Sequence, residues 1–274
     1  MKIPLLFLIL TTLFLSASPR VVSLAPSITE TIAFIGAEDC LVGVTTHCVY
    51  PERALKLPKI GGYQGINYER IMLLKPDLVI GIPAIHDAQE KFSRLGLNYF
   101  EIKQDNIDDI FKSVLKLGRL LDRREQAELK LLEMKNEIRE LAVKSRSSSK
   151  VLLVIGNLPG ELKDIYLAGP DCFLGELLSR LGYINAYEGN IEYPKVSVEQ
   201  ILKSSPERII ILSEKNNLSD QETAALCAPW KSLKLKHSFQ VDVLHGEEVF
   251  IPGPRLLTTM KKLQKILESN AAGQ

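Results

Sequence analysis

The chain of 274 residues has few of the side chains that hold metal ions and redox centres. It contains four histidines and four cysteines, with no HxH or HExxH pairing and no CxxC spacing. Zinc sites and dithiol redox sites are built from such spacings. A directly bound metal ion and disulfide-exchange chemistry are therefore disfavoured.

Signatures of common catalytic sites are also missing. The sequence has no GxSxG, no P-loop and no GxGxxG after an expected strand. The glycine-rich stretch 61–65 is too short and misplaced for a dinucleotide loop. The formal net charge is only +1, which gives a nucleic-acid partner no electrostatic support. We therefore expect neither an enzyme nor a nucleic-acid-binding protein.

The N-terminus reads as a targeting segment. Lys2 supplies a positive start, Ile3–Leu15 is largely apolar, and small residues follow at 16–18. We predict a cleavable signal peptide over residues 1–18, with an uncleaved anchor as the alternative, since the apolar stretch is shorter than the ~20 residues of a membrane span. The first cysteine, Cys40, is far from the cleavage point, so no lipid anchor is expected.

The most informative feature present is a pattern that occurs twice. Tyr68–Ile80 reads YERIMLLKPDLVI and Val198–Ile210 reads VEQILKSSPERII, at a constant offset of 130 positions. Each copy has an acidic residue, Glu69 or Glu199, at the start of a short amphipathic segment. A proline ends that segment, and a β-branched run typical of a buried strand follows. Two similar helix–strand units indicate two similar lobes.

The chain divides into two α/β halves of domain size. Residues 20–122 and 150–270 each alternate strand and helix patterns, which predicts Rossmann-like lobes with parallel sheets and right-handed crossovers. Between them, 123–149 contains a segment, Arg123–Lys144, rich in Glu, Lys, Arg and Leu without Gly or Pro. A helix of this length spans about 33 Å. We interpret it as one long connecting helix, the alternative being a packed helix of one domain.

The four cysteines leave their pairing open. In an exported protein, Cys40, Cys48, Cys172 and Cys227 could oxidise in pairs, with three possible connectivities. Cys172 and Cys227 lie in the second half and could meet in one lobe. The alternative is that all are small buried thiols.

These segments resemble a class of bacterial periplasmic binding proteins whose two lobes are joined by one long helix. Members of that class serve ABC importers of cobalamin, ferric siderophores, haem and some metal ions, and the likeness is greatest to the cobalamin-binding members. The matching segments are RVVSLAPSITET (20–31), VGVTTHCVYP (42–51), GGYQGINYERIMLLKPDLVI (61–80), YPKVSVEQILKSSPERIII (193–211) and PGPRL (252–256).

The resemblance implies a docking role for the repeated acidic residues. Glu69 and Glu199 match the lobe-tip glutamates that form salt bridges with arginines of the importer's membrane subunits. The alternative is that both are helix-start carboxylates favoured by the helix dipole, an effect of about 0.3–1 kcal/mol each.

The resemblance also implies a ligand cleft formed by loops after the strands. His47 matches a ligand-contacting tyrosine, Tyr63 and Tyr193 match tryptophans that flank the corrin ring, and 247–251 matches a contact loop. Tyrosine in place of tryptophan keeps a smaller stacking surface. The full set of expected ligand-binding residues is His47, Tyr50, Tyr63, His86, Tyr193, Glu247, Phe250 and Arg255.

Three of these residues have open alternatives. Tyr50 could equally pack beneath its loop, and His86 could be a loop histidine without a role. His47 could be a loop histidine without a role; alternatively, it could ligate the metal at the centre of a macrocycle or donate a hydrogen bond to the macrocycle's side groups.

Together these expectations describe a soluble, monomeric periplasmic binding protein without a resident cofactor. Its cargo is expected to be cobalamin or a related corrinoid, a metal chelate, with a ferric siderophore or haem as the alternative. Its expected partner is the permease dimer of an ABC importer with its ATPase.

Overall fold

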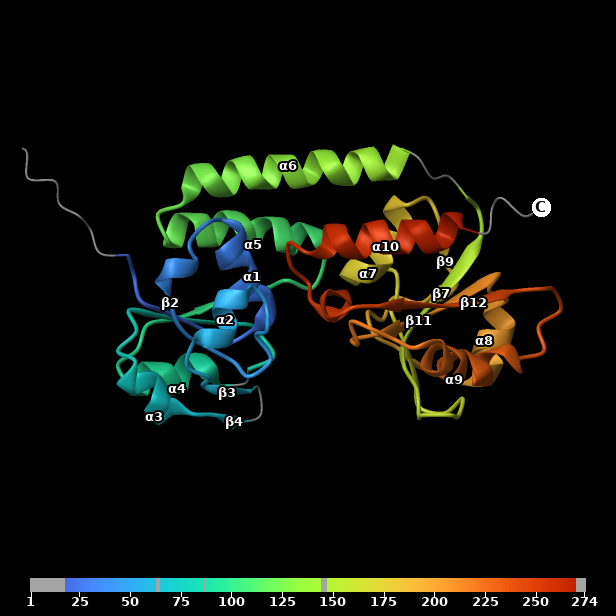
Figure 1. Ribbon diagram of the computed structural model, residues 1–274, viewed down its shortest axis with the longest axis horizontal. Helices are drawn as coiled ribbons and strands as arrows, with labels where there is room; N and C mark the ends of the chain where they lie inside the picture. Colours follow the sequence, from blue (N-terminus) through green and yellow to red (C-terminus); the bar gives the residue numbers. More distant parts are fainter. Residues whose placement is uncertain (1–17, 63–64, 86, 144–146, 270–274) are drawn as a thin grey trace, which may run out of the picture.

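The computed structural model describes residues 18–62, 65–85, 87–143 and 147–269. Two α/β lobes lie side by side, and one long helix runs along both (Figure 1). The predicted two-lobed α/β fold is confirmed. Residues 1–17, which contain nearly all of the predicted signal peptide, lie outside the described residues.

The first lobe is built around a four-stranded parallel sheet with the order β2-β1-β5-β6. Its strands are β1 (Val21–Ser23), β2 (Leu41–Val44), β5 (Leu78–Gly81) and β6 (Tyr99–Glu101), with a separate hairpin of β3 (Gly61–Gly62) and β4 (Gly65–Ile66). Its helices are α1 (Pro26–Phe34), η1 (Glu38–Cys40), α2 (Glu52–Lys56), α3 (Tyr68–Leu73), α4 (Ala88–Arg94) and α5 (Ile107–Leu120).

Alternate residues of the central strands enter different cores, as expected for strands buried on both faces. Val21 and Ile80 pack with α1 and α5, whereas Val22 and Val79 pack with α3 and α4. The lobe is thus a sheet between two helical layers.

The second lobe has a sheet with the order β10-β8-β7-β11-β12, and β9 pairs with β7. Its strands are β7 (Lys150–Gly156), β8 (Ile165–Leu167), β9 (Ile184–Asn185), β10 (Lys195–Val196), β11 (Arg208–Ser213) and β12 (Gln240–His245). Its helices are α7 (Phe173–Arg180), α8 (Val198–Ser204), α9 (Asp220–Lys231), η2 (Glu247–Phe250) and α10 (Leu256–Glu268).

This second sheet corrects the expectation that both sheets are parallel. β7, β9, β11 and β12 are parallel, but β8 runs antiparallel to β7 and to β10. Only residues 157–164 connect β7 to β8. A parallel return needs a crossover of a dozen or more residues, so this short connection can only reverse the chain.

The repeated sequence forms the same unit in both lobes. α3 and α8 begin at residues 68 and 198, and β5 and β11 begin at 78 and 208. The offset seen in the sequence therefore holds for both elements of the unit.

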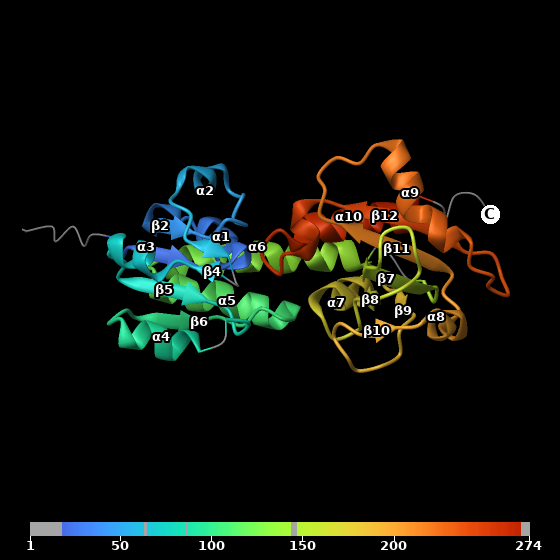
Figure 2. The same cartoon turned by 90° about the horizontal axis from the view of Figure 1, so that it is seen from below.

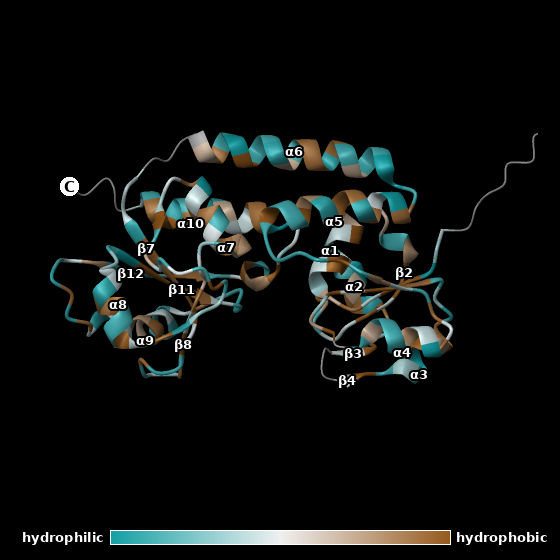
Figure 3. Ribbon diagram, turned by 180° about the vertical axis from the view of Figure 1, so that it is seen from behind, coloured by the Kyte–Doolittle hydropathy of each residue, from teal (hydrophilic) through white to brown (hydrophobic). Residues whose placement is uncertain are grey.

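The long helix α6 (Arg124–Val143) packs into the cores of both lobes. Ala127 and Leu131 join the first core, while Met134 and Ile138 join the second. Its outward side is largely hydrophilic (Figure 3). These contacts show one helix that runs along two lobes.

Helix α5 also crosses the lobe boundary, which the sequence did not predict. Its first turns place Ile107 and Ile110 in the second core, and Val114 lies in the first. The backbone N–H of Ile107 donates to Glu176 Oε2 of α7 at 2.9 Å. Figure 2 shows the start of α5 beside α7. The expected domain boundary at residue 122 stays a prediction. Helix α5 precedes this boundary in the sequence, yet its first turns pack with the second lobe.

Two helices embedded in both cores should resist hinge bending. We therefore expect the free and ligand-bound forms to differ by a small rotation of the lobes, not by wide closure. Small-angle X-ray scattering with and without ligand measures this directly. A large decrease in the radius of gyration on ligand addition would contradict the prediction.

The four cysteines are free thiols in the described chain, and all are buried. Burial raises the pKa of each thiol. Cys172 and Cys227 lie in different cores of the second lobe, on opposite faces of its sheet. This arrangement favours the alternative of small buried thiols over a Cys172–Cys227 disulfide.

Candidate functional site

A cavity of about 530 Å³ opens between the two lobes. This volume is within the range of small-molecule sites. Its walls are Pro26, Ser27, Thr46, His47, Val49, Ile82, Pro83, Ala84, Gln104, Asp105, Glu214, Glu247, Phe250, Ile251 and Pro252.

Every wall residue follows the carboxyl end of a parallel strand. The first lobe contributes the loops after β1, β2, β5 and β6, and the second contributes those after β11 and β12. Ligands of open α/β sheets bind at this edge because loops and free backbone groups converge there. The topology of each lobe therefore directs the loops at this edge of its sheet into one shared cleft.

Three of the expected ligand-binding residues meet in this cavity. His47 lies in the loop after β2, while Glu247 and Phe250 lie on η2 of the other lobe. A Cβ added at Gly62 would lie 3.2 Å from His47 Nε2, so the glycine permits a close approach of the hairpin to the imidazole. The segment 247–251, expected as a contact loop, is corrected in its local structure, since Glu247–Phe250 is a 3-10 helix.

Arg255 and Tyr50 lie beside the cavity and contact each other. The Arg255 guanidinium is 4.3 Å from the centroid of the Tyr50 ring, a cation–π contact. Arg255 donates two hydrogen bonds to Glu30, at 2.9 and 2.6 Å, and one to Glu247 at 2.8 Å. Its guanidinium is thus already committed to protein carboxylates.

These contacts join the two lobes. Glu30 lies on α1 and Tyr50 follows β2, whereas Arg255 immediately precedes α10. The Glu30 side chain is only 2% exposed, and its burial raises its pKa while Arg255 opposes that shift. Glu248 lies 3.9 Å from Arg255 and accepts a hydrogen bond from Lys262 at 2.6 Å. We call Glu30, Arg255, Glu247, Glu248 and Lys262 the interlobe ion network.

Tyr193 is outside the cavity wall but near it. The residue is 44% exposed, while its hydroxyl is turned inward, toward the buried Cys172 thiol. Desolvation, followed by the nearby charges of Cys172 and Glu192, raises the pKa of this hydroxyl, and Asp105 of the cavity wall adds to the shift. A desolvated hydroxyl with an exposed ring suits a stacking platform.

The remaining two ligand candidates, Tyr63 and His86, lie outside the described residues. Their assignment stays a prediction, as does the ligand-binding role of the other six.

Glu69 and Glu199 are exposed residues in the first turns of α3 and α8. The Asn67 side chain accepts from Arg70 N at the start of α3, and Ser197 forms a capping box at the start of α8. A hydrogen bond from Ser197 lowers the pKa of Glu199. Both helices lie on the side of the molecule away from α6 (Figure 1). The two carboxyl groups therefore occupy matching and accessible positions.

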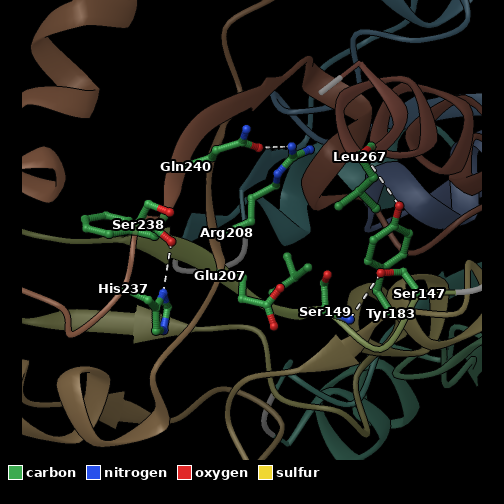
Figure 4. Close-up of a pocket in the computed structure, with 11 residues that line it drawn as sticks. Ser147, Ser149, Tyr183, Glu207, Arg208, His237, Ser238, Gln240 and Leu267 are labelled. Carbon is green, nitrogen blue, oxygen red and sulfur yellow. Dashed lines mark hydrogen bonds between the residues drawn. The ribbon is translucent and has the colours of Figure 1, made fainter. Parts of the chain in front are cut away.

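A larger cavity of about 740 Å³ lies within the second lobe (Figure 4). Its wall includes Arg208 and Gln240, the first residues of β11 and β12. The Arg208 guanidinium is bonded to Gln240, and it is 3.5 Å from Asp242. This cavity lies at the amino ends of the parallel strands, opposite the edge used for ligands, and involves only one lobe.

The described ranges contain no group of three or more His, Cys, Asp or Glu placed to hold a metal ion. They also contain no helix that is both long and apolar enough to cross a bilayer.

Sequence reasoning missed several residues at the cleft. Gln104, Asp105 and Glu214 line it, and Glu30 supports it. Glu30 carried a usable signal, because a single carboxylate within the apolar helix PSITETIAF requires a buried partner. The other three are ordinary loop residues in the sequence.

The chain is similar to known binding proteins along nearly its whole length. It is 29% identical over 254 residues to the vitamin B12-binding protein of Vibrio parahaemolyticus, covering 91% of this chain and 90% of that one. Among solved structures, the periplasmic vitamin B12 binding protein of Vibrio cholerae has a TM-score of 0.74 at 26% identity, covering 94% and 99% of the two chains. A periplasmic heme binding protein from Pseudomonas aeruginosa has a TM-score of 0.76 at 25% identity, covering 91% and 92%.

A family model described as periplasmic binding protein matches residues 21–225. Such proteins are non-enzymatic components of transport that work with the permease and ATPase of an ABC importer. The expectations of a binding protein and of the helix-linked class are thus confirmed, and the chain belongs to the periplasmic binding protein family.

Proposed function

We propose that this protein binds cobalamin or a related corrinoid between its lobes and delivers it to an ABC importer. The cleft carries the proposal: one cavity of about 530 Å³ takes its walls from six strand ends in two lobes. Exposed Tyr193 lies near this cavity, and His47 and Phe250 line it. A flat macrocycle with polar side groups fits such aromatic and polar walls.

The names of relatives support a corrinoid over other metal chelates. The Vibrio parahaemolyticus relative and the Vibrio cholerae structure are both named for vitamin B12. Haem is the second candidate, favoured by the likeness to the Pseudomonas aeruginosa protein. A ferric siderophore remains the further alternative within this family.

Export and assembly are part of the same proposal. A signal peptide over 1–18 would release a soluble periplasmic monomer, and Glu69 and Glu199 would meet basic sites on the two permease subunits. Mass spectrometry of the mature N-terminus tests the cleavage.

Stacking against Tyr63 and Tyr193 is the first test of the ligand site. Titration calorimetry with cyanocobalamin should give a stoichiometry near one. The double variant Tyr63→Ala, Tyr193→Ala should bind at least tenfold more weakly, or about 1.4 kcal/mol, because it loses both aromatic faces.

Tyr166→Ala is the matched control, since Tyr166 is 43% exposed on β8, outside the cleft. It should bind cyanocobalamin as the wild type does. Unchanged affinity in the double variant would refute stacking, and binding of hemin without cyanocobalamin would establish the second candidate instead.

A further inference from the structure

The described walls of the cleft carry negative charge and hydrogen-bond acceptors but no lysine or arginine. Asp105 comes from the first lobe, and Glu214 and Glu247 come from the second. Basic side chains lie behind these walls, but their charge is shared among several carboxylates. Lys103 lies 3.2 Å from Asp105 and 3.4 Å from Asp109.

The same sharing holds on the other side of the cleft. In the interlobe ion network, Arg255 and Lys262 face three carboxylates, those of Glu30, Glu247 and Glu248. Glu214 is exposed at the end of β11. Among the residues that the structure describes, carboxylates thus outnumber cations around the cavity, so a ligand entering it meets a negative potential.

A buried amide adds an acceptor to this wall, and its orientation is fixed. Gln104 Nε2 donates to Thr31 Oγ1 at 3.3 Å and to Ser113 Oγ at 2.9 Å. Those hydroxyls donate their own protons to the carbonyls of Ser27 and Ile110, both at 2.7 Å. Each hydroxyl has one proton, so both can only accept from Gln104. The amide nitrogen must therefore face them.

The carbonyl oxygen of this amide lacks a hydrogen-bond donor. Gln104 is 3% exposed, and its Oε1 has no hydrogen-bond partner among the described residues. A buried acceptor without a donor is unfavourable, and an N–H group that reaches it removes the penalty. Gln104 lines the cavity, but its Oε1 is closed off from solvent, so a ligand N–H reaches this acceptor by displacing the atoms that cover it.

We propose that this cleft selects its macrocycle by the peripheral groups, accepting carboxamides and rejecting free carboxylates. The inference rests on the proposed function and specifies its ligand class. A corrinoid carries primary carboxamides, which donate N–H groups without charge, whereas the porphyrin of haem carries two propionates. Asp105 and Glu214 repel a carboxylate in the cleft, and Gln104 Oε1 accepts from an amide.

Selection between carboxamide and carboxylate is best tested with ligands that differ from cyanocobalamin in one side group. The monocarboxylic acid derivatives of cyanocobalamin each have one propionamide hydrolysed to a propionate, with the ring unchanged. We expect at least one of these isomers to bind the wild-type protein tenfold or more weakly than cyanocobalamin. The difference should shrink at high salt, since the cleft is open to solvent.

In the variant Asp105→Asn, Glu214→Gln, the ratio of the affinity for cyanocobalamin to the affinity for the acid isomer should fall at least threefold. Asp108→Asn with Glu128→Gln is the charge-matched control on α5 and α6, and it should leave the difference unchanged. Equal affinity of the wild type for cyanocobalamin and every acid isomer would overturn the inference. So would an equal effect of the control variant.

Gln104→Met tests the acceptor separately, because it keeps the side-chain length and removes the carbonyl oxygen. We expect at least fivefold weaker cyanocobalamin binding in a variant that thermal denaturation shows to be folded. Wild-type affinity in the folded variant would refute the role of Gln104. If the variant does not fold, the acid isomers still decide the charge argument.

The same titrations distinguish a failure of this inference from a failure of the proposed function. A wild-type protein that does not bind cyanocobalamin would refute the proposed function itself. A protein that binds cyanocobalamin and its acid derivatives alike would keep the proposed function and lose only the inference.

Discussion

Reversing Glu69 and Glu199 together to arginine is expected to abolish ligand uptake in cells and stimulation of the importer's ATPase. The two carboxylates occupy equivalent exposed positions at the starts of α3 and α8, one on each lobe. A two-fold permease would present one basic site to each. Reversal replaces two attractive contacts by two repulsive ones, and like-charge juxtaposition costs several kcal/mol at an interface.

Ligand affinity in solution should stay within about twofold in the same variant, because neither residue contacts the cleft wall and distant sites act independently. Each single reversal should give a partial defect. The control is Glu125→Arg with Glu140→Arg, two exposed glutamates of α6 on the other side of the molecule. It changes the net charge equally and should transport normally.

Normal transport by the Glu69, Glu199 variant would show that the repeat reflects only helix-start chemistry. Loss of ligand binding would instead show that the cleft has been placed wrongly. Uptake of labelled ligand and ATPase activity in reconstituted vesicles distinguish these results.

The parts of the fold that could be predicted are those in which the determining residues are neighbours in sequence. In both repeat copies, the proline and the β-branched run adjoin the helix they end, so α3–β5 and α8–β11 follow directly from the pattern. The connecting helix could be predicted equally well, since its 20 residues include no Gly or Pro that would end a helix.

The parts that could not be predicted depend on contacts between distant residues. The short connection before β8 dictates an antiparallel strand only once β8 pairs with β7, and neither segment alone indicates that pairing. Helix α5 has a regular helix pattern whether it contacts one core or two. Arg255 was expected to contact ligand, which stays a prediction, and its protein partner Glu30 is 225 residues away. Nothing local to either residue indicates that pairing.

The Glu30–Arg255 pair gives the largest expected effect on stability. Arg255→Leu removes the cation and leaves the Glu30 carboxylate in a site where its side chain is 2% exposed. Breaking a buried ion pair from one side typically costs about 3–5 kcal/mol, because an uncompensated charge stays buried. For a chain of this size, the melting temperature should fall by roughly 6–20 °C. Thermal denaturation followed by circular dichroism measures the change.

Arg124→Leu makes the same substitution at an exposed pair with Glu128 on α6. It should cost no more than about 1 kcal/mol, since exposed ion pairs contribute little. If Arg255→Leu proves equally mild, the apolar contacts of α5 and α6 hold the lobes without help from the ion network.

The double variant Glu30→Leu, Arg255→Leu separates the pair's own contribution from the penalty of an orphaned charge. Replacing both partners of a buried pair with apolar side chains is often neutral for stability, so most of the loss should be recovered. The position of Glu247 in the cleft wall should not be recovered. Glu30 and Tyr50 hold Arg255 across the boundary between the lobes. Arg255 in turn binds Glu247, so the double variant loses this support of the wall. We therefore expect the double variant to melt near the wild type yet bind ligand more weakly. Full recovery of both properties would show that the network positions neither the lobes nor the cleft.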